Sequence, residues 1–343
     1  MRRIVIHRPG GFEQLYVESA ADPVPQPGEI LVRSQSMGVN YADSIVRMGL
    51  YASAKKYVGY PITPGFELAG IVERVAADVT DVRAGARVVA LTRFGGYATA
   101  VSVPRRQVFP IPDGFSEEEA GGFPVVFLTA HYALSELAHV REGEWVMVHS
   151  AGGGVGMAAL QIARLRGART IAVVGHSDKV AHVERLGADV IVDKSKEDPF
   201  KVGRRAAPSG FDIILDANGP ATLAASYENL RPTGRLVVYG FHSMLPRGTG
   251  RVNFLRLAID YLKIPRFSPM SLTNDNKSVL AFNLSYLFEE TSLLERGMDQ
   301  LLVWAKEGRI KPLPTRAYRF EHVAQAHRDL ESGKTVGKLV LVA

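Results

Sequence analysis

The chain of 343 residues contains no cysteine. This absence excludes a disulfide framework, a cysteine nucleophile, an iron–sulfur cluster and a zinc site built from thiolates. A chain without disulfides is compatible with the cytoplasm, where we expect the protein to work. No uncharged apolar run approaches the roughly 18 residues that a membrane-spanning helix needs, and the short apolar run before His7 is no signal peptide. We therefore expect no transmembrane segment.

The excess of basic residues is small and dispersed. Lys and Arg number 41 against 35 Asp and Glu, which gives a net charge of +6. The densest basic spots, at 105–106 and 201–205, are typical of solvated surface, so we expect no nucleic-acid partner. With 46% apolar residues and 22% charged residues, the composition is that of a globular protein long enough for two domains.

The chain changes its pattern near residue 125. Residues 1–124 alternate short β-rich runs with Gly and Pro, which predicts an antiparallel barrel or sandwich. Residues 125–286 alternate apolar strands with helices, which predicts βαβ units and a doubly wound parallel sheet covered on both faces. Beyond them, the pattern predicts helices over 293–307 and 320–332 and a final strand from residue 338.

The sharpest motif follows the apolar run at 145–149. Its pattern is A-x-G-x-x-G, and a helix begins directly after it. In such a turn one glycine admits the pyrophosphate of a dinucleotide, the free N–H groups of the helix bind its charge, and the last glycine lets helix and strand pack closely. The pattern predicts a dinucleotide site, the alternative being a merely tight strand–helix turn. The predicted contacts are Ala151, Gly153, Gly154, Val155 and Gly156.

The second strand of this unit indicates which dinucleotide binds. An NAD site places an acidic residue about 20 residues beyond the glycines, at the end of that strand. Here the strand ends in Gly175, Ser177 and Lys179 follow, and Lys194 comes after the third strand. A small residue with hydroxyl and ammonium groups nearby suits a 2′-phosphate, and so favours NADPH. Alternatively, Ser177 caps the next helix and Lys179 is a solvated residue of its first turn.

Two further residues follow parallel strands. Asn218 comes after the strand at 211–217, and Phe241 comes after the strand at 235–240. Cofactors cross such sheets at the carboxyl ends of the strands. Both residues are therefore candidates for contact with the adenosine or the nicotinamide.

Several segments carry a family resemblance over essentially the whole chain. They are GVNYADSIVRMGLY (38–51), PITPGFELAGIVERV (61–75), the glycine motif and VGKLVLV (336–342). The chain resembles the zinc-independent quinone oxidoreductase branch of the medium-chain dehydrogenase/reductase superfamily. Within that branch, FNLSYL (282–287) and EGRIKPL (307–313) are most similar to the synaptic-vesicle membrane protein (VAT-like) group.

The resemblance implies an architecture. A GroES-like catalytic barrel would comprise 1–124 plus 287–343, and a Rossmann NADP-binding domain would comprise 125–286, with the active site between them. It also implies a homodimer, in which a strand near 280–287 extends the parallel sheet across subunits. The apolar run FNLSYLF fits either that edge pairing or an ordinary core.

Departures from the superfamily concern the metal. Zinc-dependent relatives carry a ligand Cys where this chain has Asn40, and a ligand His where it has Phe66. We therefore expect no catalytic zinc. Without a metal, alcohol oxidation loses its electrophile, whereas reduction of a conjugated carbonyl needs only a hydrogen-bond donor for the developing oxyanion. The implied function is NADPH-dependent reduction of a quinone or an α,β-unsaturated carbonyl.

The resemblance also implies roles for single residues. Asn40 would lie by the nicotinamide and the substrate, the alternative being a turn-forming Asn. Tyr51 would be the proton donor or oxyanion partner, the alternative being an aromatic residue on the barrel surface. A second tyrosine of the family is replaced by Ile45, which weakens direct transfer of the family's substrate.

Three more residues are assigned to the cofactor in the same way. Thr129 would contact the nicotinamide end, unless it is a helix-interior Thr bonded to its own backbone. Asn283 would reach the nicotinamide amide. Lys338 would lie by the cofactor phosphates, unless it is a surface lysine.

A function of a different class also fits the resemblance. Some VAT-like relatives look like adaptors that keep the fold. The chain could therefore be a nucleotide-binding adaptor or a membrane-associated module with little catalytic turnover. The intact glycine motif and Asn40 favour the enzyme.

Overall fold

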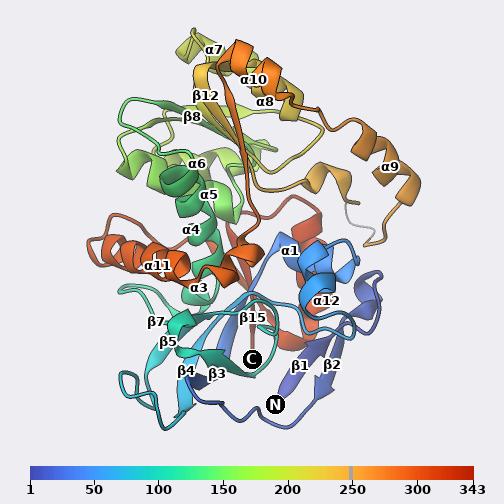
Figure 1. Cartoon of the computed structure of the whole chain (residues 1–343), viewed down its shortest axis with the longest axis vertical. Helices are drawn as coiled ribbons and strands as arrows, with labels where there is room; N and C mark the ends of the chain where they lie inside the picture. The colour runs from blue at the N-terminus through green and yellow to red at the C-terminus, as the bar shows by residue number, and fades with distance from the viewer. Residues whose placement is uncertain (247–249) are drawn as a thin grey trace.

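The computed structural model describes residues 1–246 and 250–343, which form a barrel and a parallel sheet (Figure 1). The barrel sheet has the strand order β14-β15-β3-β4-β5-β7, and β6 also pairs with β3. Its pairs are antiparallel except β14 with β15, and Leu339 of the last strand lies opposite Val39. The C-terminus thus closes the barrel. The strands are β3 (Glu29–Val39), β4 (Glu67–Val75), β5 (Arg87–Leu91), β6 (Ala100–Pro104), β7 (Val108–Pro110), β14 (Thr315–Arg319) and β15 (Lys338–Val342).

The second sheet is parallel throughout and has the order β10-β9-β8-β11-β12-β13. This is the order of a doubly wound dinucleotide-binding sheet, with the change of direction beside β8. The predicted fold class, a GroES-like barrel plus a Rossmann sheet, is confirmed. The strands are β8 (Trp145–Val148), β9 (Arg169–Val174), β10 (Val190–Asp193), β11 (Phe211–Asp216), β12 (Leu230–Val238) and β13 (Ser278–Ala281).

Helices cover both faces of the parallel sheet and join it to the barrel (Figure 1). Two of them end in a glycine with positive φ, Gly167 at 74° and Gly187 at 73°, as the left-handed cap requires. No helix in the two described stretches is long and apolar enough to cross a membrane. The α-helices are α1 (Tyr41–Arg47), α2 (Ala52–Tyr57), α3 (Glu117–Gly121), α4 (Pro124–His131), α5 (Gly154–Leu165), α6 (Val180–Arg185), α7 (Pro199–Ala206), α8 (Leu223–Glu228), α9 (Phe254–Leu262), α10 (Pro269–Asp275), α11 (Thr291–Lys306) and α12 (Val323–Glu331).

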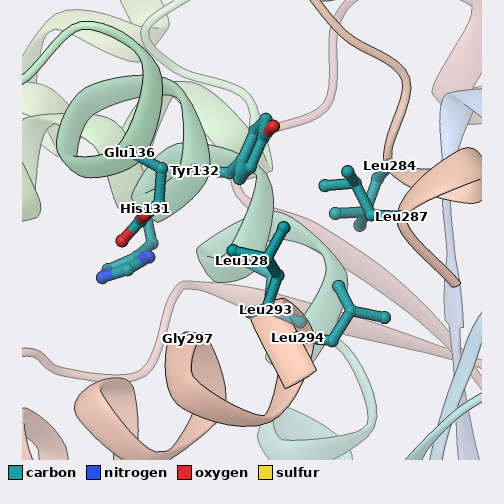
Figure 2. A pocket seen from close by; sticks show the side chains of 9 residues that line it. All are labelled: Leu128, His131, Tyr132, Glu136, Leu284, Leu287, Leu293, Leu294 and Gly297. Atoms are coloured by element: carbon teal, nitrogen blue, oxygen red, sulfur yellow. The ribbon is translucent and has the colours of Figure 1, made fainter. Parts of the chain in front are cut away.

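One apolar core runs through both sheets. Its buried members include Leu91 of the barrel, Phe127 of α4 and Val148 of the parallel sheet. Because these side chains pack into one cluster, the two sheets hold a fixed relation, and any site between them is shaped by both. A small hollow of about 10 Å³ remains at the edge of this core, where α4, α11 and residues 284–287 meet (Figure 2). It is lined by Leu128, His131, Tyr132, Glu136, Leu284, Leu287, Leu293, Leu294 and Gly297.

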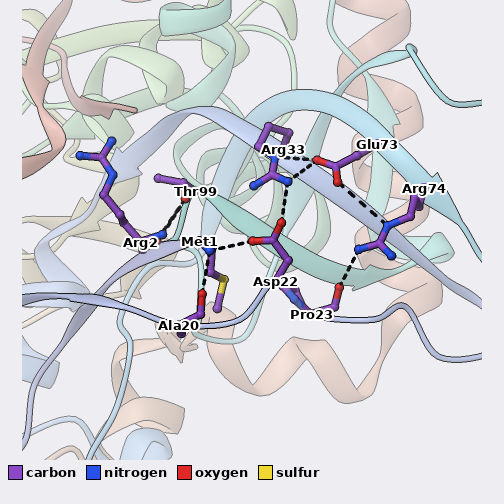
Figure 3. A network of polar contacts seen from close by, with 9 residues as sticks. All are labelled: Met1, Arg2, Ala20, Asp22, Pro23, Arg33, Glu73, Arg74 and Thr99. Atoms are coloured by element: carbon purple, nitrogen blue, oxygen red, sulfur yellow. Dashed lines mark hydrogen bonds and ion pairs between the residues drawn. The ribbon is translucent and has the colours of Figure 1, made fainter.

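Short elements complete the N-terminal half. Ion pairs next to the hairpin of β1 (Arg2–Val5) and β2 (Tyr16–Ser19) join it to the barrel, as Figure 3 shows. The Met1 amino group lies 2.7 Å from Asp22, and the Arg33 guanidinium lies 2.8 Å from the same carboxylate. Hydrogen bonding from Arg33 holds the pKa of Asp22 well below its usual range. The 3-10 turns are Phe12–Gln14, Arg105–Gln107, Ser177–Lys179, His242–Met244, Leu284–Glu289 (η6) and Phe320–His322, and Tyr132–Leu137 is π-helical.

The strand expected near 280–287 is shorter than predicted. β13 ends at Ala281, and the run FNLSYLF turns into η6 instead. The Asn283 side chain accepts the N–H of Ser285 at 3.0 Å, and this local cap replaces the pairing of an extended strand. Phe288 then packs into the core. The prediction of a strand through 287 was therefore wrong, and only Ser278–Ala281 lies at the sheet edge.

Candidate functional site between the two sheets

The glycine turn opens the site on the side of the parallel sheet. Gly153 caps α5, and a Cβ placed on it would meet only the Ser150 carbonyl, at 3.4 Å. A Cβ on Gly156 would lie 2.5 Å from that same oxygen and 2.6 Å from the Cα of Ala151, so α5 packs directly on the turn. The first N–H groups of α5, at Gly154 to Gly156, have no acceptor within the helix. The turn thus combines free space with donors suited to a phosphate.

A C-terminal loop, residues 333–337, lies against this turn. The Gly337 N–H donates to the Gly152 carbonyl at 3.0 Å. The Lys179 ammonium donates to the carbonyls of Gly333 and Thr335, at 2.7 Å each. Burial lowers the pKa of Lys179. The alternative of a solvated Lys179 was therefore wrong, and its ammonium holds the loop in place.

Ser177 and Lys194, the other residues expected at a 2′-phosphate, differ in their surroundings. The Ser177 hydroxyl donates to the Asp193 carboxylate at 2.5 Å, and hydrogen bonds from Ser177 and Ser195 lower the pKa of Asp193 to about 2. Lys194 is exposed and lies beside Gly175, with its Cε 3.9 Å from the place of a Cβ there. Lys194 thus lies at the end of β9, whereas the Ser177 hydroxyl is bonded to Asp193.

The ends of the next strands carry Asn218 and Phe241. The Ser150 hydroxyl donates to the Asn218 Oδ1 at 3.1 Å, which brings this amide to the glycine turn. The Asn218 Nδ2 is buried and has no acceptor among the described residues. Buried N–H groups are rarely left unpaired, so this donor points to a missing ligand or water. Phe241 is 41% exposed and packs beside Gly219.

The barrel contributes a buried cluster of Asn40, Glu67 and Lys338. The Lys338 ammonium lies 2.5 Å from Asn40 Oδ1 and 2.7 Å from Glu67 Oε1. Asn40 Nδ2 donates to that same Glu67 oxygen at 2.8 Å, and the Val125 N–H donates to the other at 2.7 Å. Glu67 is fully buried and Lys338 is 3% exposed. The cluster fixes the amide of Asn40 in one orientation.

Lys338 reaches this cluster through a passage between two glycines. A Cβ on Gly122 would lie 2.4 Å from the Lys338 Cγ, and one on Gly154 would lie 3.6 Å from its Cδ. The lysine stem therefore passes beside the first residue of α5. The alternative of a surface lysine was wrong, because β15 directs this side chain inward.

Thr129 lies in α4 and is 7% exposed. Its hydroxyl donates to the Val125 carbonyl at 2.7 Å, one turn earlier in the helix. This is the bond expected of a helix-interior threonine. The structure therefore places Thr129 near the Asn40 cluster through Val125, with its hydroxyl occupied by its own backbone.

Tyr51 and Asn283, predicted separately, are hydrogen-bonded to each other. The Tyr51 hydroxyl donates to Asn283 Oδ1 at 2.8 Å, and burial raises the pKa of Tyr51, so the phenol keeps its proton. Phe66 and Phe94 pack edge-on against the Tyr51 ring, with centroids 5.8 and 6.3 Å away. Tyr51 thus lies among aromatic rings at the junction of the barrel and η6.

This bond is the first contact of a seam between α2 and η6. The Ser285 hydroxyl donates to Ser53 Oγ at 2.8 Å, and the Tyr57 hydroxyl donates to Glu289 at 2.5 Å. Each contact joins residues 232 apart in the chain. We call this row of three contacts the α2–η6 seam.

The geometry does not fit a zinc ion. Among residues 1–246 and 250–343, no three His, Cys, Asp or Glu side chains gather as metal ligands. At the place of the family's ligands stand Asn40 and Phe66, and the Lys338 ammonium already neutralises Glu67. A divalent cation would be repelled by that ammonium.

Comparisons with known proteins agree with this geometry. Residues 26–113 match the family described as alcohol dehydrogenase GroES-like domain, and residues 186–341 match the one described as zinc-binding dehydrogenase. The rat synaptic vesicle membrane protein VAT-1 homolog is 34% identical over 345 residues, which cover 100% of this chain and 84% of the relative. The chain belongs to the medium-chain dehydrogenase/reductase superfamily. It is an oxidoreductase of that superfamily, close to the VAT-1 homologs.

Solved structures of this superfamily have the same fold. The human VAT-1 homolog-like protein is 28% identical with a TM-score of 0.84, covering 100% of this chain and 98% of its own. Quinone oxidoreductase of Escherichia coli, solved with NADPH, is 26% identical with a TM-score of 0.86, and both chains are covered completely.

Two residues of the site escaped the sequence analysis. Glu67 was considered only as the neighbour of Phe66, although an acid directly before the apolar run LAGIV (68–72) indicates a buried partner. Phe94 lies in a loop, and no pattern in the sequence places it against Tyr51. Both contacts depend on packing between segments far apart in the chain.

Proposed function

We propose that the protein is an NADPH-dependent, zinc-independent reductase of quinones or α,β-unsaturated carbonyls. In this proposal 125–286 form the NADP-binding domain, and 1–124 with 287–343 form the catalytic domain. One observation carries the proposal. The buried cluster in which the Lys338 ammonium pairs with Glu67 lies directly beside an open glycine turn, whose helix N-terminus offers free N–H groups.

The residues present fit a dinucleotide. Gly153 leaves room at the turn, the N-terminus of α5 supplies donors, and the unpaired Asn218 Nδ2 supplies another. Lys194, whose Cε lies 3.9 Å from the place of a Cβ on Gly175, is the cation that we propose to pair with a 2′-phosphate. When bound, the reduced cofactor supplies a hydride to the quinone or to the β-carbon of the enone.

Tyr51 is the residue proposed to serve the substrate oxygen. It keeps its proton because burial raises its pKa, and its hydroxyl donates to Asn283 Oδ1. To stabilise a developing oxyanion, the hydroxyl has to turn from Asn283 to the substrate. Asn40, whose amide Lys338 and Glu67 hold in one orientation, is the residue that we propose to face the nicotinamide and the substrate.

The test of the proposal is fluorescence titration with NADPH and NADH, followed by turnover of benzoquinone and methyl propenyl ketone. We expect NADPH to bind at least tenfold more tightly than NADH, because Lys194 can pair with the 2′-phosphate. Lys194→Ala should reduce that preference, and the matched change Lys196→Ala, two residues away, should leave it unchanged. NADPH binding without turnover of either acceptor would contradict the reductase function and would indicate a nucleotide-binding protein instead.

Tyr51→Phe is expected to lower kcat at least tenfold and to leave the Kd for NADPH unchanged. The reason is that the variant removes one hydroxyl donor while keeping the ring between Phe66 and Phe94. Steady-state kinetics with methyl propenyl ketone measure the change. Tyr60→Phe is the control, since the Tyr60 hydroxyl donates to the Val46 backbone. Equal kcat values for Tyr51→Phe and the wild type would exclude the donor role.

We further infer a cytoplasmic homodimer. β13 is one of the two edge strands of the parallel sheet, and the outer edge of its four residues, Ser278–Ala281, is not paired with another strand of the described chain. An exposed edge of this kind can pair with the same edge of a second copy.

One observation favours the second candidate, a membrane-associated module with little turnover. α9 stands apart from the body of the molecule and has no buried residue (Figure 1). Its residues Phe254, Leu255 and Leu262 are 70%, 74% and 78% exposed. Helices with such an apolar face and basic neighbours can lie on membranes. Liposome flotation separates the candidates: a protein that oxidises NADPH and does not float is the enzyme.

A further inference from the structure

Two cations gather around one aromatic ring at the outer end of the α2–η6 seam. The Arg93 guanidinium carbon lies 4.1 Å from the centroid of the Tyr57 ring, and the Lys56 ammonium lies 4.6 Å from it. Lys56 also lies 5.5 Å from the ring of Tyr286. The three segments that meet here are α2, the loop after β5, and η6. The Lys56 ammonium also donates to the Tyr57 hydroxyl at 2.9 Å. Neither this hydrogen bond nor a contact with an aromatic ring neutralises a cation.

The guanidinium of Arg93 has no acceptor within hydrogen-bond distance among the described residues. None of its N–H groups makes a hydrogen bond within the described parts of the chain, and its Nε is buried without a partner. Its one ion pair, with Glu289, is 3.8 Å long. A guanidinium has five donors in a fork that matches a carboxylate or a phosphate. Arg93 is therefore held in place with its recognition groups unused.

Glu289 neutralises only one of the two cations. Its carboxylate accepts the Tyr57 hydroxyl at 2.5 Å, and this bond lowers the pKa of Glu289, which keeps the carboxylate charged. One negative charge thus faces two positive charges. Lys55 and Glu290, the next residues along the chain, add one charge of each sign. The cluster keeps an excess positive charge that an anion from outside can balance.

The cluster lies close to the proposed reaction centre. Tyr51 and Tyr57 are six residues apart at the two ends of α2, about 9 Å at the rise of a helix. Phe94, the neighbour of Arg93, packs on the Tyr51 ring. A small molecule whose carbonyl lies at Tyr51 can therefore reach Arg93 with its far end.

We propose that Arg93 and Lys56 form a subsite for an anionic group, a carboxylate or a phosphate, at the far end of the substrate. The inference rests on the proposed reductase function and narrows it to substrates with a negatively charged tail. Arg93 supplies the paired donors, Lys56 supplies a second charge, and Tyr57 and Tyr286 hold both cations.

The experiment compares three enones that differ only at the end of a four-methylene chain on the β-carbon. One ends in a carboxylate, one in its methyl ester and one in a phosphate. We expect kcat/KM for the better charged substrate to exceed that for the ester at least tenfold, and the ranking of the two charged substrates identifies the group. Arg93→Gln and Lys56→Gln should raise KM for the charged substrates and leave kcat and the ester unchanged.

Arg106→Gln is the matched control, because Arg106 lies on the same barrel as Arg93, is exposed and pairs with Glu295 of α11. Equal kcat/KM values for acid and ester, unchanged by Arg93→Gln, would overturn the subsite and leave the reductase intact. A second readout does not need turnover. In calorimetric titration with the saturated keto acid, tenfold weaker binding by Arg93→Gln supports the subsite, and equal binding overturns it.

Discussion

Replacement of Lys338 by methionine is expected to lower the free energy of unfolding by about 3–5 kcal/mol. Glu67 would then remain fully buried without the ammonium that lies 2.7 Å from it. It would keep the N–H donors of Asn40 and Val125, at 2.8 and 2.7 Å, but two neutral donors do not replace a cation at such a site. Chemical denaturation of the two proteins measures the loss.

The double variant Lys338→Met, Glu67→Gln isolates the cause. Because it removes both charges, we expect it to recover most of the lost stability, since a neutral amide is far less costly to bury than an unpaired carboxylate. A single variant as stable as the wild type would show that the Lys338–Glu67 pair carries no net stabilisation. A double variant that folds but has a lower kcat than the wild type would indicate that the charged pair also orients the Asn40 amide. Its kcat and pH profile, compared with those of the wild type, then report the positioning of Asn40 separately from folding.

What the sequence could predict is what short segments determine. The glycine turn follows from a strand, the glycine-rich motif at 151–156 and a helix in direct succession, and Gly156 packs on Ala151 as that order requires. The partners of Ser177 and Lys179 are different in kind. Asp193 is the last residue of another strand, β10, and the carbonyls that hold Lys179 lie 154 and 156 residues further on. No local pattern contains such contacts.

Tyr51 and Asn283 illustrate the same limit at the barrel. The family resemblance indicates each residue separately, but not that the hydroxyl of one is engaged by the amide of the other. The same amide accepts the Ser285 N–H and so ends the strand that the apolar run FNLSYLF suggested. Phe288, the last residue of that run, is buried, which agrees with the alternative of an ordinary core, whereas a single side-chain cap decided the backbone.

Two glycines three residues apart separate cofactor binding from folding. Gly153→Ala is expected to weaken NADPH binding by about two orders of magnitude at nearly unchanged stability. Its φ of −90° and ψ of 171° are an extended conformation that alanine adopts, and the new methyl would meet only the Ser150 carbonyl, at 3.4 Å. The methyl would therefore occupy the space that the pyrophosphate needs, without disturbing the protein.

Gly156→Ala is expected to weaken NADPH binding for a different reason, a clash within the protein. Its methyl would lie 2.5 Å from the Ser150 carbonyl and 2.6 Å from the Ala151 Cα, and both are backbone atoms. α5 has to move away from the turn, so we expect a loss of about 1–3 kcal/mol in unfolding free energy together with weaker NADPH binding. Fluorescence titration and chemical denaturation of both variants give the comparison. If Gly153→Ala bound NADPH as the wild type does, the pyrophosphate would not lie at this turn, because no other feature protects that affinity from a methyl group placed there.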